Sequence, residues 1–186
     1  MKAIAAVLPG RDSVPTRLAV QFGVLALAVG CFVRFGVSAE TLTAVFFVAV
    51  LVVLSAIDIE RRILPNVILL PATGALLVAQ IALFPERAVE FVVSGLGAAL
   101  FLLVLIAVYP KGMGMGDAKL ALFLGIGLGS AVGFGLLAGA LAASVASIVL
   151  LVRYGAAARK MAIPFGPFLA FGAVFALFGG HALFGG

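Results

Sequence analysis

Six stretches of the sequence contain no charged residue, and each is long enough to form most of a membrane-spanning helix. They are residues 18–33, 41–57, 63–85, 91–110, 120–152 and 161–180. A helix that crosses a bilayer needs about 20 apolar residues. Only 10% of the residues are charged, so the chain has more apolar surface than a soluble core of this size can bury. The sequence therefore predicts an all-α fold, a polytopic bundle of transmembrane helices.

The stretch 120–152 is too long for one span. As a single helix it would measure about 50 Å, whereas the hydrocarbon core is about 30 Å thick. Glycines interrupt its first part, at positions 125, 127, 129, 133 and 135. We therefore expect a short helix over 117–129, a turn, and a return helix over 132–152. This gives about seven membrane segments with a short, Gly-broken fifth; the alternative is six segments, with 118–152 as one long or re-entrant element.

The basic residues predict the orientation. If the N-terminus is cytoplasmic, only Arg34 and Arg87 of the 12 basic residues fall in outer loops. The positive-inside rule favours this arrangement, and it explains the net charge of +5 without a nucleic-acid partner. Six segments would place Arg153, Arg159 and Lys160 outside, so the charge distribution favours seven. We expect residues 1–17 to be a cytoplasmic lead-in and residues 18–186 to form a single membrane domain.

Two of the seven acidic residues stand out by position. Asp58 directly follows the uncharged stretch 41–57, and Asp117 opens the short fifth segment. In the orientation above, both lie at the cytoplasmic edge of the membrane, on different helices, where they are able to pair. A structural role is the alternative for each: Asp58 as an ion-pair partner of Arg61 or Arg62 along a helix, and Asp117 as a helix N-cap.

A pair of carboxylates is suited to peptide hydrolysis. Two such groups about 3 Å apart do not both ionise easily, so they share a proton. The ionised group takes a proton from water as that water attacks the carbonyl, and the protonated group polarises the carbonyl and later protonates the leaving amine. Glycines at 112, 114 and 116 precede Asp117 and would let a substrate strand or a facing helix approach closely. A phosphate-binding loop is a weak alternative, because no strand precedes this run.

Three other features favour packing over chemistry. Gly135, Gly139, Ala143 and Ser147 recur every four residues and predict close contact with a neighbouring helix. The single cysteine, Cys31, lies in an apolar run, and one cysteine makes neither an internal disulfide nor a Cys-rich zinc site. The single histidine, His181, has no evident partner in the sequence. We expect no cofactor and no metal.

Three segments resemble motifs of the type IV prepilin peptidases, a family of GxGD membrane aspartic peptidases. Ser55–Asn66 (SAIDIERRILPN) resembles the first aspartate motif, and Gly112–Leu120 (GMGMGDAKL) resembles the GxGD motif. Ile163–Phe168 (IPFGPF) resembles a third stretch near the C-terminus. The resemblance covers about residues 15–180, with the order, spacing and membrane context of the three motifs in agreement.

The resemblance implies an aspartic endopeptidase that removes the basic leader of type IV prepilins and pseudopilins at the cytoplasmic face of the bacterial inner membrane. It implies Asp58 and Asp117 as the catalytic pair. Gly114 and Gly116 take their places in the GxGD motif, and Lys119 and Arg62 are supporting candidates.

The sequence departs from many members of the family in one respect. Those members carry a further helix and two Cys-x-x-Cys pairs, which go with N-methylation of the product and with zinc. This chain resembles the short, peptidase-only form of Flp/Tad pilus systems, and we expect it to lack N-methyltransferase activity. Two other functions compete with this interpretation: a catalytically silent homologue that acts in pilus or secretion assembly, and a small transporter with a Gly-broken helix.

Overall fold

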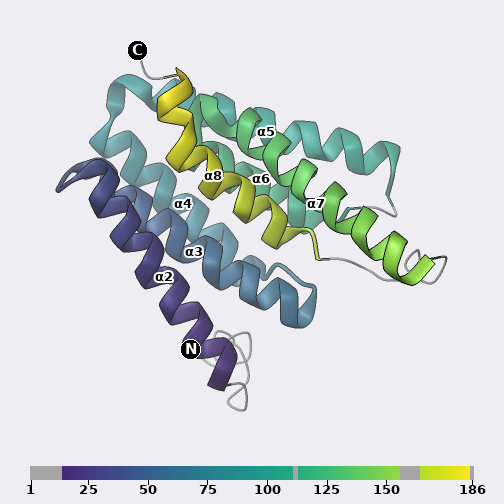
Figure 1. The fold of residues 1–186 in the computed structure, drawn as a ribbon. Coiled ribbons are helices and arrows are strands. Elements are labelled where there is room, and N and C mark those ends of the chain that lie inside the picture. Colours follow the sequence, from purple (N-terminus) through teal and green to yellow (C-terminus); the bar gives the residue numbers. More distant parts are fainter. Residues whose placement is uncertain (1–13, 111–112, 156–163, 185–186) are drawn as a thin grey trace.

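The computed structural model describes residues 14–110, 113–155 and 164–184, and every regular element in these ranges is helical. The helices are α2 (Val14–Phe35), α3 (Ala39–Arg61), α4 (Asn66–Leu83), α5 (Ala88–Val108), α6 (Met115–Leu128), α7 (Val132–Tyr154) and α8 (Gly166–Phe184). Two single 3₁₀ turns, η1 (Pro85–Arg87) and η2 (Gly129–Ala131), join α4 to α5 and α6 to α7. Figure 1 shows these helices side by side in one bundle, as predicted from the sequence.

The helices have the length and composition of membrane spans. Within the described residues, five helical stretches are long and apolar enough to cross a bilayer. One of them, Met115–Tyr154, comprises both α6 and α7. A shorter apolar helix covers Gly166–Gly179. Large apolar side chains are exposed along the outer faces of these helices, for example Val33 and Val152, as expected where the surrounding solvent is lipid. The chain is a multi-pass membrane protein.

The short fifth segment is confirmed. α6 has 14 residues, about 21 Å of helix, and it ends where Gly129 adopts a positive φ of 58°. A side chain is strained in that conformation, which glycine adopts readily. The start of α7 at Val132 agrees with the prediction, whereas α6 begins at Met115, two residues before the expected start.

The chain reverses direction between α6 and α7. Glu90, in the first turn of α5, accepts a 2.8 Å hydrogen bond from the N–H of Ser130 in this turn and pairs with Arg87 at 3.0 Å. Farther along α7, Gly139 approaches the backbone of Phe168 near the start of α8. α7 therefore runs back toward the end of the bundle where α8 begins, which supports seven segments over six.

α6 is the central helix of the bundle. The ring of Phe123 in α6 stacks on the ring of Phe47 in α3, with 5.2 Å between the ring centroids. On its other side, Gly125 lies so close to Gly95 of α5 that a Cβ atom at position 125 would overlap the backbone there. Gln80 of α4 donates a 3.3 Å hydrogen bond to the carbonyl of Ile126. Contacts with three neighbouring helices thus hold α6 in place although it is short.

The predicted small-residue stripe packs over half of its length. Gly135 and Gly139 are buried against α8, where Gly172 is too close to both backbones to accept a Cβ atom. Ser147 is exposed and donates a 2.8 Å hydrogen bond to the carbonyl of Ala143 in its own helix. The stripe therefore serves as an interface near the start of α7 and is open to the surroundings at Ser147. Cys31 is fully buried in the apolar core, as expected.

Candidate active site

Asp58 lies in the last turn of α3 and is buried, with 6% of its surface exposed. Its Oδ2 atom accepts a 2.9 Å hydrogen bond from the backbone N–H of Gly166, the first residue of α8. Its own carbonyl accepts a 2.8 Å hydrogen bond from the N–H of Arg62, which adopts a left-handed conformation and ends α3. The carboxylate is thus positioned by two separate elements, its own helix and the N-terminus of α8.

Asp117 lies in the first turn of α6 and is 9% exposed. Its Oδ2 atom accepts a 2.9 Å hydrogen bond from the N–H of Gly114, which is the N-cap of the helix. The alternative of Asp117 as the N-cap is therefore wrong in detail: the helix begins earlier, at Met115, and Asp117 is its third residue. It still stabilises the helix start, because a carboxylate at the third position accepts the unpaired N–H of the N-cap.

The structure brings the two aspartates to the same end of the bundle, which we call the aspartate end. α3 ends here, and α6 and α8 begin here. Each carboxylate is held through one oxygen by a backbone N–H at a helix N-terminus, where the helix dipole favours negative charge. The candidate site therefore consists of two buried carboxylates held by fixed backbone donors.

Gly166 is a residue that sequence reasoning left without a role. A Cβ atom at this position would lie 2.7 Å from Oδ2 and 3.2 Å from Cγ of Asp58. Only glycine lets the start of α8 come close enough for its N–H to reach the carboxylate. The Gly166–Pro167 step is a signal for a helix start, because proline is favoured in the first turn, but it does not indicate which residue the start of the helix faces.

The two glycines of the GxGD motif differ in their surroundings. A Cβ atom on Gly116 would lie 3.1 Å from Cβ of Leu64, in the segment between α3 and α4. On Gly114 the nearest atom would be Oδ2 of Asp117 at 3.8 Å, an ordinary contact. The expected close approach of a facing segment is therefore present at Gly116, and Gly114 contributes its N–H. Gly112 lies outside the described residues.

The supporting candidates Lys119 and Arg62 are placed differently. The Lys119 Nζ atom donates a 3.0 Å hydrogen bond to Oδ1 of Asn66, at the start of α4. This hydrogen bond joins the two aspartate motifs. Asn66 ends the first aspartate motif but was not among the candidate site residues, because nothing in its spacing from Lys119 indicates a contact. The side chain of Arg62 is exposed, and its contribution to the site is the backbone cap that ends α3. The side chain of His181 lies outside the described residues.

Comparisons with known proteins agree with this arrangement. A family model described as "Type IV leader peptidase family" matches residues 45–152, a range that holds both aspartates. The prepilin leader peptidase/N-methyltransferase of Bacillus subtilis (strain 168) is 30% identical over 156 residues, covering 81% of this chain and 61% of the relative. The protein of the same name from Burkholderia pseudomallei (strain 1026b) is 33% identical over 170 residues, covering 87% of this chain and 55% of the relative.

This chain therefore spans between 55% and 61% of the length of these curated relatives. No solved structure matches the sequence significantly. The family match covers more than half of the chain and includes both aspartate motifs. On these grounds the chain belongs to the type IV leader peptidase family.

Proposed function

We propose that this protein is an aspartic endopeptidase that removes the basic leader from type IV prepilins or pseudopilins. The observation that carries the proposal is the pair of buried carboxylates, Asp58 and Asp117, each held through Oδ2 by a backbone N–H at the same end of the bundle. Family membership supports it, because the curated relatives are named as prepilin leader peptidases.

The chemistry needs one proton shared between the two carboxylates. The ionised carboxylate removes a proton from a water molecule as the water oxygen bonds to the scissile carbonyl carbon. The protonated carboxylate donates a hydrogen bond to the carbonyl oxygen. The C–N bond then breaks, the leaving nitrogen takes a proton from the pair, and the products are a leader with a new carboxyl group and a pilin with a new amino group.

We propose that the aspartate end faces the cytoplasm, in a bacterial inner membrane. Arg61, Arg62 and Lys119 lie at this end, whereas Arg87 lies at the opposite end beside the turn between α6 and α7. This distribution supports a cytoplasmic N-terminus by the positive-inside rule. The scissile bond then lies at the headgroup level, where water is available, and not in the hydrocarbon interior.

The chain is further proposed to cleave without methylating its product. The resemblance associates methylation with Cys-x-x-Cys pairs, and the single cysteine of this sequence provides none. Mass spectrometry of a pilin processed by this chain alone tests the point. An N-terminus heavier by one methyl group would contradict it.

Co-expression with a prepilin from the same genome tests the main proposal. We expect the prepilin to shift to its mature size on a gel only when this protein is present, and N-terminal sequencing to place the cut after the basic leader. The proposal would be overturned if every prepilin encoded in that genome stayed intact in membranes that contain the full chain.

A further inference from the structure

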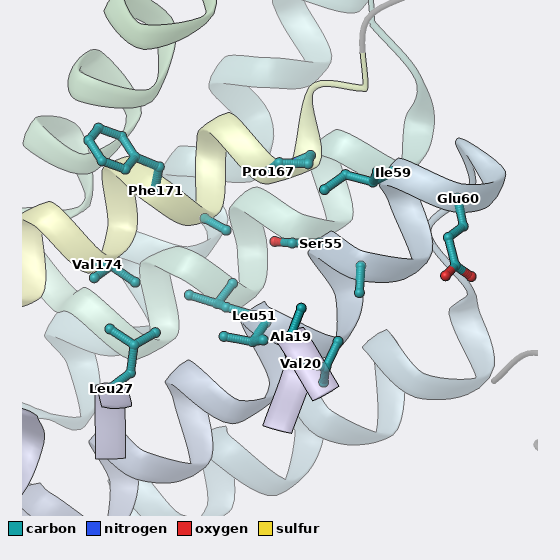
Figure 2. Close-up of a pocket in the computed structure, with 13 residues that line it drawn as sticks. Ala19, Val20, Leu27, Leu51, Ser55, Ile59, Glu60, Pro167, Phe171 and Val174 are labelled. Atoms are coloured by element: carbon teal, nitrogen blue, oxygen red, sulfur yellow. The ribbon is translucent and has the colours of Figure 1, made fainter. Parts of the chain in front are cut away.

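An apolar groove of about 500 Å³ lies between α2, α3 and α8. Figure 2 shows Ile59 and Glu60 at one end of the groove, and Leu27 and Val174 at the other. Its walls are apolar except for Ser55 and Glu60. Small residues of all three helices line it, Ala19 on α2, Ser55 on α3 and Ala170 on α8. Small residues at such a surface let another helix approach closely in a membrane.

The helices α2 and α8, which flank the groove, form a wedge (Figure 1). Toward the far end of the bundle, α2 and α8 touch, because a Cβ atom on Gly30 would lie 3.2 Å from the ring of Phe178. Toward the aspartate end, α2 leans on α3, at Gly23 against Val52, and separates from α8 (Figure 1). The two helices therefore converge at the far end and diverge toward the candidate active site.

One end of the groove lies beside Asp58. Ile59 and Glu60 follow Asp58 directly in α3. Pro167 follows Gly166, whose N–H holds the Asp58 carboxylate. A chain that leaves the groove at this end therefore emerges one residue away from Asp58 on α3 and one residue away from Gly166 on α8, although neither aspartate lines the groove itself.

We propose that this groove binds the apolar helix of the prepilin substrate, an inference that rests on the function proposed above. Three features select this occupant over a lipid chain or a second copy of the protein. The small residues suit a helix, the groove ends beside the candidate active site, and the acidic Glu60 lines that end, where a basic leader would emerge. The bound helix would set the depth of the scissile bond, so that the peptide beyond its end is the segment that Asp58 meets.

A substitution that fills the groove tests the inference. Ala19→Phe places a ring in the groove from an exposed position on α2, so it does not disturb the core. Ala26→Phe is the matched control, an exposed alanine of the same helix that does not line the groove. In liposomes that contain the full chain and a prepilin from the same genome, we expect Ala19→Phe to slow cleavage about tenfold or more. The ring would compete with the substrate helix for the same space, and the free-energy cost of overpacking commonly exceeds the 1.4 kcal/mol that corresponds to a tenfold change. Ala26→Phe should cleave at the wild-type rate.

Cross-linking gives a second readout that does not depend on catalysis. In an Asp117→Asn background and with an added mild oxidant, Phe171→Cys, at a residue of α8 that lines the groove, should form a disulfide with a cysteine introduced in the apolar helix of the prepilin. Val104→Cys, at a residue of α5 that is 53% exposed, should form no such disulfide. Cys31 is fully buried and does not compete.

The two proposals fail in different ways. If the wild-type protein cleaves the prepilin, Ala19→Phe cleaves it equally fast and position 171 forms no cross-link, the groove is not the binding site and the peptidase function stands. If the wild-type protein cleaves no prepilin and neither position forms a cross-link, both proposals are overturned.

Discussion

The backbone N–H of Gly166 donates a 2.9 Å hydrogen bond to Oδ2 of Asp58, between residues 108 positions apart in the chain. This contact ties the C-terminal motif of the sequence to its first aspartate motif. It explains why glycine occupies the first position of α8, since a Cβ atom would lie 2.7 Å from the same oxygen.

Substitution of Gly166 should therefore disturb the site directly. We expect Gly166→Ala to lower the rate of prepilin cleavage by about tenfold or more. The added methyl group would displace the atoms around Asp58, and overpacking of this kind typically costs about 1–3 kcal/mol of free energy. Gly97→Ala is the matched control, since a Cβ atom there has nothing within 4 Å. Cleavage rates at equal protein levels in membranes provide the measurement; a fully active Gly166→Ala variant would show that the contact is dispensable.

The two aspartates should be separately essential. Asp58→Asn and Asp117→Asn each replace a carboxylate with an amide, which serves neither as base nor as acid. We expect each variant to lose about 100-fold or more of the cleavage rate while it still accumulates in the membrane. Glu86→Gln, at an exposed position of η1, is the control with the same type of change. Normal processing by either aspartate variant would rule out the pair.

The Lys119–Asn66 hydrogen bond should act as a positioning contact between α6 and α4. We expect Lys119→Met and Asn66→Ala each to lower cleavage by a few-fold, and the double variant to be no worse than the more affected single variant. Such non-additive behaviour is expected of two groups that act through one contact. A double-mutant cycle on cleavage rates measures the coupling, and additive losses would show that the two side chains act independently.

Arg62 should matter through its backbone conformation. With φ of 54° it occupies the left-handed region, where glycine is favoured. We expect Arg62→Gly to keep or slightly raise thermal stability in detergent, and Arg62→Val to lower stability by about 1 kcal/mol or more, because β-branched residues resist this conformation. If Arg62→Gly instead cleaved the prepilin much more slowly without losing stability, the guanidinium group itself would have a role.

Topology reporters should separate the two ends of the bundle. A fusion after Glu86 or Gly129 should report outside, and a fusion after Lys111 or Ala157 should report inside. The reason is that the basic residues concentrate at the aspartate end. A cytoplasmic signal at Gly129 together with an external signal at Ala157 would contradict the orientation and the reversal after α6.

The sequence by itself was enough for the fold class and the short fifth segment. Apolar stretches, charges and glycines are local signals, and in a bilayer they leave little choice, because each span must satisfy its own backbone hydrogen bonds as a helix. The break at Gly129 was predictable for the same reason, and the motifs around Asp58 and Asp117 indicated the candidate pair before the structure placed the two residues at one end.

Only the tertiary structure decided which elements meet. The Gly166 contact with Asp58, the Asn66 contact with Lys119 and the wedge between α2 and α8 join residues that are distant in sequence. Helix packing in a membrane depends on the shapes of whole faces and on close backbone approach. No periodicity within one segment encodes the partner that the segment will face, so these contacts came from the assembled bundle.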